Sequence, residues 1–152
     1  MADVFRPATV ADVAAIVPRL RQADIDECNA LVGPGRVLAT AASTVAGSPY
    51  AMAWEHDGEL IALFGVAGSL LDDIGAPWMF GTPAMHRCGR ALISASPAYI
   101  RQMTELFPIL SNVVDVRNVR SIRWLKRMGF TFHPARPMGP QGVMFYPFTM
   151  GV

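Results

Sequence analysis

RNVRSIRWLKRMGF, residues 117–130, combines five positive charges with an apolar stripe and reaches a glycine at position 129. Within it, Ile122, Leu125 and Met128 recur at the spacing that places side chains on one face of an α-helix. The basic residues follow another face of the same helix and include Arg120, Arg123 and Arg127. The pattern predicts an amphipathic helix over 119–128, whose apolar face packs on a core and whose basic face meets solvent.

The clearest strand signal lies upstream, where YAMAWEH and ELIALFGV flank the dipeptide Asp57-Gly58. Gly tolerates positive φ, so this dipeptide predicts a type I′ turn between two antiparallel strands. Further strands are predicted over 77–82, 110–116 and two closing segments, FTFHP and VMFYPFTM.

Four more helices are expected from capping and breaker residues. Thr9 with Asp12 three residues later resembles a capping box, so a helix should begin there. Helices are also predicted over 22–32, stopping at Gly33, and from 37 to about 45. Ser96 followed by Pro97 predicts the start of a helix that ends before Pro108.

The order of these elements predicts an α/β (α+β) fold over residues 1–152. It would have one mixed, mostly antiparallel central sheet with helices on both faces. A chain of 152 residues suits a single domain with one core.

The composition is that of a folded protein, because 52% of the residues are hydrophobic and only 16% are charged. The longest apolar run, 60–71, is shorter than the roughly 20 residues a bilayer requires, so no membrane span is expected. MADVFRP lacks a basic flank with an apolar run, which favours a cytoplasmic protein.

The net charge of +1 conceals two opposite halves. Residues 1–76 hold four arginines and ten acids, whereas residues 77–152 hold nine basic residues and two acids. The C-terminal half is therefore a candidate seat for an anionic ligand. The alternative is that the halves complement each other, within one fold or between copies in a homo-oligomer.

No metal site is expected. Cys28 and Cys88 share no ligand-like spacing with His56, His86 or His133, so the cysteines are interpreted as reduced, partly buried thiols.

Residues 117–130 resemble motif B of the GNAT superfamily of acyl-CoA N-acyltransferases, commonly Asn-x-x-Ala/Ser-x-x-x-Tyr-x-x-x-Gly-Phe. The matching positions are Asn118, Ser121, Gly129 and Phe130. The preceding strand, the early segment RPATVADVAAI and the hairpin follow in the family's order. The resemblance implies acetyl-CoA as cofactor and an amine as acceptor, with the cofactor wedged between splayed strands.

The resemblance also implies where the cofactor binds. The family's pyrophosphate loop, Gln/Arg-x-x-Gly-x-Gly/Ala, is matched by residues 86–91, with His86 at the first position; its expected contacts are Arg87, Gly89, Arg90 and Ala91. The backbone of Phe64, Gly65 and Val66 would pair with the pantetheine amides. Asn118 and Ser121 would hold the cofactor arm. An ordinary basic loop is the competing interpretation of residues 86–91.

The catalytic groups depart from the family pattern. The Tyr that commonly protonates the CoA thiolate falls at Leu125, which cannot donate a proton. Glu59 is the candidate base, and Asp72 or Asp73 after the hairpin is the alternative. Tyr146 is the candidate acid, with Tyr99, Cys88 and His133 as other conceivable donors. An exposed, solvated carboxylate without a catalytic role is the alternative interpretation of Glu59, Asp72 and Asp73.

Residues such as APWMFGT and RSIRWL also resemble small GNAT-like proteins of short-tailed bacteriophages. This similarity implies an alternative function: a catalytically degenerate internal virion or assembly protein that contacts other phage structural proteins. A third reading is a nucleic-acid-binding protein that uses the basic face of helix 119–128, although no helix-turn-helix spacing precedes it.

Overall fold

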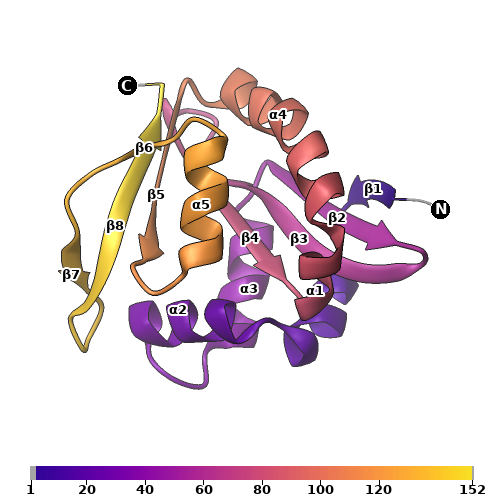
Figure 1. The fold of residues 1–152 in the computed structure, drawn as a ribbon, viewed down its shortest axis with the longest axis horizontal. Coiled ribbons are helices and arrows are strands. Elements are labelled where there is room, and N and C mark those ends of the chain that lie inside the picture. The colour runs from indigo at the N-terminus through magenta and orange to yellow at the C-terminus, as the bar shows by residue number, and fades with distance from the viewer. Residues whose placement is uncertain (1–2, 152) are drawn as a thin grey trace.

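The computed structural model describes residues 3–151 and shows a mixed sheet enclosed by helices (Figure 1). The strands are β1 (Asp3–Pro7), β2 (Tyr50–His56), β3 (Glu59–Ala67), β4 (Ile74–Gly81), β5 (Ile109–Asp115), β6 (Thr131–Phe132), β7 (Arg136–Met138) and β8 (Val143–Met150). The helices are α1 (Val10–Ile16), α2 (Gln22–Val32), α3 (Val37–Ala46), α4 (Gly89–Leu106) and α5 (Val119–Arg127), with 3₁₀ turns η1 (Val17–Arg19) and η2 (Pro83–Cys88).

The strands follow the order β1-β2-β3-β4-β5-β8-β6, and β7 pairs with β8. Within the described residues, β4 and β5 form the one parallel pair, and every other pair is antiparallel. The predicted mixed, mostly antiparallel sheet is therefore confirmed. The short strand β7 was not predicted.

Helices cover both faces of the sheet, as expected. On one face, α1 and α3 pack around a cluster that includes Val13, Ile16, Ala53 and Leu63. On the other, α4 and α5 pack around a larger cluster that includes Phe107. Neighbouring residues of β3 point to opposite faces, so this central strand contributes to both clusters and is buried from Ile61 to Val66.

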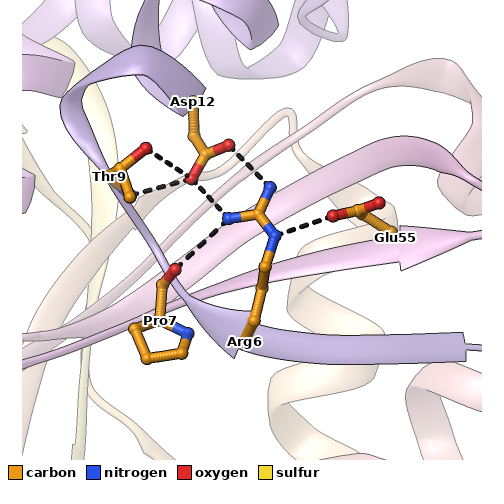
Figure 2. A network of polar contacts seen from close by, with 5 residues as sticks. All are labelled: Arg6, Pro7, Thr9, Asp12 and Glu55. Atoms are coloured by element: carbon orange, nitrogen blue, oxygen red, sulfur yellow. Dashed lines mark hydrogen bonds and ion pairs between the residues drawn. The ribbon is translucent and has the colours of Figure 1, made fainter.

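A polar network fixes the start of the chain to the hairpin (Figure 2). Arg6 of β1 donates through Nε to Glu55 of β2 at 2.7 Å and through both terminal nitrogens to the Asp12 carboxylate at 2.8 Å. Asp12 also accepts the backbone N–H of Thr9 at 2.8 Å, which completes the predicted capping box of α1. The Arg6 guanidinium holds the pKa of Asp12 below its usual range.

Several local predictions are confirmed. Asp57 and Gly58 both adopt positive φ, 50° and 81°, as a type I′ turn requires. The second predicted helix occupies Gln22–Val32 and ends at Gly33, whose φ is 94°. Helix α5 ends at Arg127, one residue before the predicted limit.

The predicted start of α4 at Pro97 is wrong, because the helix begins at Gly89 and Pro97 lies inside it. Proline in a helix removes one backbone hydrogen bond and strains the preceding turn. Packing compensates: Leu92 contacts the large core cluster, and Ser96 is buried and donates its hydroxyl to the Leu92 carbonyl at 2.5 Å. Tertiary contacts thus override the local preference of Ser-Pro for a helix start.

None of the helices between residues 3 and 151 is long and apolar enough to cross a membrane.

Candidate functional site

The centre of the sheet contains a V-shaped gap between β4 and β5. These parallel strands pair only at Ile74 with Ile109 and at Gly75 with Leu110. Beyond that point both strands continue, to Gly81 and Asp115, without pairing to each other. The gap therefore opens toward the carboxyl ends of both strands.

The open edge of β4 presents unpaired backbone at Met79. In an antiparallel ladder, alternate residues direct their N–H and C=O groups to opposite sides of the strand. Thr82 donates to Ile61 of β3, so the alternate residues Pro77, Met79 and Gly81 face the gap. The Pro77 carbonyl and both peptide groups of Gly81 have hydrogen-bond partners, which leaves the Met79 peptide groups facing the gap.

Asn112 of β5 closes the narrow end of the gap. Its side-chain amide donates to the Pro77 carbonyl at 2.7 Å, and its amide oxygen accepts the N–H of Val113 at 2.8 Å. This one side chain replaces a rung of the missing ladder, because it satisfies a backbone acceptor on β4 and a backbone donor on β5.

Helix α2 spans the wide end of the gap. Asp24 accepts the N–H of Gly81 on β4 at 2.8 Å, and Glu27 accepts the N–H of Asp115 on β5 at 2.7 Å. The Arg21 N–H donates to the Gly81 carbonyl at 2.8 Å, and the Arg21 guanidinium pairs with Asp24 at 2.7 Å. The helix therefore holds the two strands apart by binding to the end of each.

A cavity of about 330 Å³ lies at this gap. Its wall is mainly apolar and comes from strands β1 to β5 and β8 and from helices α2 to α5. The lining includes Phe64, Met79, Ala95, Tyr99, Trp124 and Leu125, together with the polar residues Asp24, Glu27, Asn112 and Ser121. A mostly apolar cavity with a few convergent polar groups is the usual form of a small-molecule site.

The predicted pyrophosphate loop lies at the start of α4. Gly89 is the first residue of this 18-residue helix, so Gly89, Arg90 and Ala91 are in its first turn, where N–H groups lack intrahelical acceptors. A shallow hollow is lined by residues 86–91 and by His56. Gly89 has no neighbour within 4 Å of where a Cβ would stand, so the backbone there is accessible.

The charge of Arg120, in the first turn of α5, acts on that loop. Burial lowers the pKa of His86, and the positive charges of Arg120 on α5 and of Arg21 lower it further. The first turn of α4, with Arg87 and Arg90 in or next to it and the charge of Arg120 acting on it, therefore favours an anionic group.

Asn118 is buried and forms the N-cap of α5, because its side-chain oxygen accepts the N–H of Ser121 at 3.3 Å. Ser121 lines the cavity one turn later. The structure thus gives Asn118 a definite structural role in addition to its predicted contact with a cofactor.

The predicted backbone contact at Phe64, Gly65 and Val66 does not fit the sheet. These residues lie in β3, which pairs with β2 on one side and with β4 on the other. Their N–H and C=O groups are therefore committed to the sheet, and Met79 on β4 is the position with an open edge. Phe64 contributes its side chain to the cavity.

The structure does not bring Glu59 and Tyr146 together at the cavity. Glu59 is exposed and forms a salt bridge with Arg19 at 3.0 Å. Tyr146 lies on β8 with its ring against Phe132 at 6.0 Å. Neither residue is among those that line the cavity.

Of the other conceivable proton donors, Tyr99 is the one on the cavity wall. Burial raises its pKa, and its ring packs edge-on against Phe64 at 4.9 Å. Cys88 is buried within the loop 86–91, where burial raises its pKa, and His133 forms a hydrogen bond with the Thr149 hydroxyl. Leu125 also lines the cavity, at the position of the family tyrosine.

Within residues 3–151, no group of three or more His, Cys, Asp or Glu side chains is placed to hold a metal ion.

Sequence reasoning missed Glu27, Met79 and Asn112. Met79 has no side-chain signal, because its contribution is backbone that faces the gap. An Asn within the predicted strand 110–116 was an available signal, since Asn is depleted in strands.

No protein-family model matches this sequence, and no curated protein matches it either. Solved structures do resemble it across nearly the whole chain. Ard1 from Thermoplasma volcanium superposes with a TM-score of 0.75 at 16% identity and covers 99% of this chain and 97% of its own. The ribosomal-protein-S18-alanine N-acetyltransferase from Escherichia coli gives 0.65 at 16% identity, with 98% and 93% covered.

YncA from Salmonella typhimurium, a putative acetyltransferase solved with its cofactor acetyl-CoA, gives 0.61 at 18% identity, with 99% and 94% covered. At such identities the similarity shows the fold. The chain therefore has the fold of GNAT acetyltransferases.

Proposed function

We propose that this chain is an acyl-CoA-dependent N-acyltransferase that transfers an acetyl group from acetyl-CoA to an amine. The observation that carries the proposal is the gap between β4 and β5, because it combines an apolar cavity with unpaired backbone at Met79. An extended arm with amide groups would bind there as an additional strand would, through backbone hydrogen bonds.

The anionic end of the cofactor would lie at the start of α4. The first turn of α4, with Arg87, Gly89, Arg90 and Ala91, would receive the pyrophosphate through backbone N–H groups and charge-assisted bonds. Asn118 and Ser121 at the start of α5 would border the arm. The similar YncA structure, which contains acetyl-CoA, supports this cofactor.

Catalysis would depend mainly on orientation, since the amine attacks the thioester directly. Glu59 and Tyr146 lie away from the cavity, so the proposal assigns the thiolate's proton donor to Tyr99, which lines it. Leu125 at the family tyrosine position makes such a substitute necessary.

The test is isothermal calorimetry with acetyl-CoA, followed by an assay of CoA thiol release with an amine acceptor. Saturable binding is expected, together with a rise in melting temperature at a ligand concentration well above Kd. Absence of both at millimolar acetyl-CoA would exclude the proposal. Dephospho-CoA and pantetheine serve as controls that separate binding of the anionic end from binding of the arm.

The second candidate is a bacteriophage internal virion or assembly protein that kept the fold and lost the chemistry. Leu125, which replaces the family's proton donor, favours it. Purified virions would contain the protein under this proposal. Nucleic-acid binding by the exposed arginines of α5 is the third candidate and predicts DNA affinity that falls steeply with salt.

A further inference from the structure

Helix α2 brings two carboxyl groups to the cavity, and one of them has no cationic partner. Asp24 and Glu27 lie three residues apart and hence on the same side of the helix. Asp24 binds the end of β4 and Glu27 the end of β5. Both line the cavity at the gap.

Glu27 is the acid in this group that has no cationic partner. Asp24 pairs with Arg21 at 2.7 Å, and Asp115 pairs with Arg117 at 2.6 Å. No ion pair found among residues 3–151 includes Glu27. One of its oxygens accepts the Asp115 N–H, and a carboxylate retains further acceptor capacity beyond one such bond.

The surroundings of Glu27 explain its proton affinity. The pKa of Glu27 is raised to about 7, and burial is the largest cause. The negative charges of Asp24 and Asp115 raise it further, whereas hydrogen bonds from the Asp115 N–H and the Asn118 side chain lower it. The cations Arg21 and Arg117 are engaged with Asp24 and Asp115. A carboxyl group with a pKa near the working pH can both take up and release a proton.

We propose that Glu27 is the base that takes a proton from the acceptor, and that the acceptor is a primary amine carrying an apolar group. This inference rests on the proposed acetyltransferase function. The apolar group would contact the aromatic wall of the cavity, which includes Phe64 and Tyr99. The ammonium ion would be drawn to Glu27, the carboxylate without a cation.

The proton and electron transfers balance. The Glu27 carboxylate removes one proton from the ammonium ion, which leaves a neutral amine. The nitrogen lone pair then forms the C–N bond with the thioester carbonyl carbon. The C–S bond breaks and its electron pair leaves with the CoA sulfur. Tyr99 gives its hydroxyl proton to that thiolate and takes the second proton released by the nitrogen, and Glu27 returns its own proton to solvent.

The experiment measures CoA thiol release from acetyl-CoA with 2-phenylethylamine as the acceptor probe, between pH 5.5 and 8.5. Wild type, Glu27→Gln and the control Asp26→Asn are compared. Gln keeps an oxygen that can accept the Asp115 N–H but cannot take a proton. Asp26 precedes Glu27 on α2 and hydrogen-bonds Gln22 in solvent.

For wild type and Asp26→Asn, kcat/KM should rise with pH through an apparent pKa near that of Glu27, about 7. Glu27→Gln should lower kcat/KM by roughly 10²- to 10⁴-fold and abolish that pH limb. Its affinity for acetyl-CoA, measured by calorimetry, should stay within about twofold of wild type, which separates a chemical role from a structural one.

Two results would overturn this inference and leave the acetyltransferase proposal standing: bound acetyl-CoA without transfer to 2-phenylethylamine, or a Glu27→Gln variant within about threefold of wild type with the pH limb intact. A wild-type protein that does not bind acetyl-CoA would overturn the proposed function, and this inference with it.

Discussion

The two sides of β4 differ in how completely the strand is paired. Toward β3 the register runs without interruption from Ala62 opposite Gly81 to Ala67 opposite Ala76. Toward β5 it stops after Gly75. The same strand thus has satisfied backbone groups on one side and an open edge on the other. Because buried backbone groups are nearly always paired, the open side is the one where backbone groups remain available to a ligand.

The paired and open sides are also held in different ways. On the paired side, β3 is buried, and the Arg6 network ties β1, β2 and α1 together (Figure 2). On the open side, separate polar side chains maintain the separation: Asn112 at the narrow end, and Asp24 and Glu27 at the wide end. Ordinary sheet pairing stabilises the first region, whereas the second depends on a few residues.

Filling the open side should have the largest effect. Ala95 of α4 lines the cavity, so Ala95→Trp should place an indole where the cofactor arm is proposed to bind. We expect the Kd for acetyl-CoA to rise at least about 100-fold, equivalent to roughly 2.7 kcal/mol. Calorimetry measures the affinity, and circular dichroism checks the fold.

Ser94→Trp is the matched control for this prediction. Ser94 precedes Ala95 on the same helix but is exposed and does not line the cavity. Its indole should leave affinity within about twofold of wild type. Equal affinities for Ala95→Trp and wild type would show that the cofactor does not occupy the gap.

At the wide end of the gap, the raised pKa of Glu27 should make the free energy of unfolding depend on pH. The pKa of Glu27 is raised from 4.5 to about 7 in the folded chain, so the folded state binds this proton more tightly than the unfolded state. The resulting stabilisation is fully present below pH 4.5 and is lost as the pH rises to 7. Glu27→Gln removes this dependence.

Glu27→Gln should therefore raise the free energy of unfolding by about 1 to 3 kcal/mol at pH 8 and change it little at pH 4. Urea denaturation at both pH values gives the difference, in which the titrations of other groups largely cancel. A variant less stable than wild type at pH 8 would mean that the Glu27 charge is compensated in the folded chain.

The N-cap of α5 should give the smallest change. Asn118→Ala removes the acceptor for the Ser121 N–H and should lower the free energy of unfolding by about 1 kcal/mol. Asn118→Ser restores a capping hydroxyl and should recover most of that stability. If only the cap matters for the cofactor, Ser also restores acetyl-CoA affinity; if the Asn amide binds the arm, affinity stays weakened in both variants.

The elements of this fold could be predicted wherever a local signal dictates a local conformation. Asp57-Gly58 specified the hairpin, because few other dipeptides accept positive φ at both positions. Gly33 ended α2, and the apolar period of residues 119–128 predicted α5. Pro97 led to a wrong prediction of where α4 begins, because packing of the first half of α4 outweighed the preference of Ser-Pro for a helix start.

The candidate site was predicted only in part. The loop at 86–91 and Asn118 were predicted because their neighbours in sequence resemble a known motif; the structure places the loop at the start of α4 and Asn118 at the N-cap of α5, and their contact with a cofactor stays a prediction. Phe64, Gly65 and Val66 were chosen one strand away from the open edge, because a single sequence does not show which strand of a sheet loses its neighbour. The two residues predicted to be catalytic lie away from the cavity: Glu59 pairs with Arg19 at the surface, and Tyr146 packs against Phe132.

The sequence by itself determined the periodicities, turns and caps, and from them the mixed sheet with its covering helices, because each depends on residues close together in the chain. Only the tertiary structure decided that β4 and β5 part after two residue pairs, that Asn112 and α2 hold them open and that Glu27 remains without a cation. Those properties depend on hydrogen bonds and burial between residues distant in sequence, which no local pattern records.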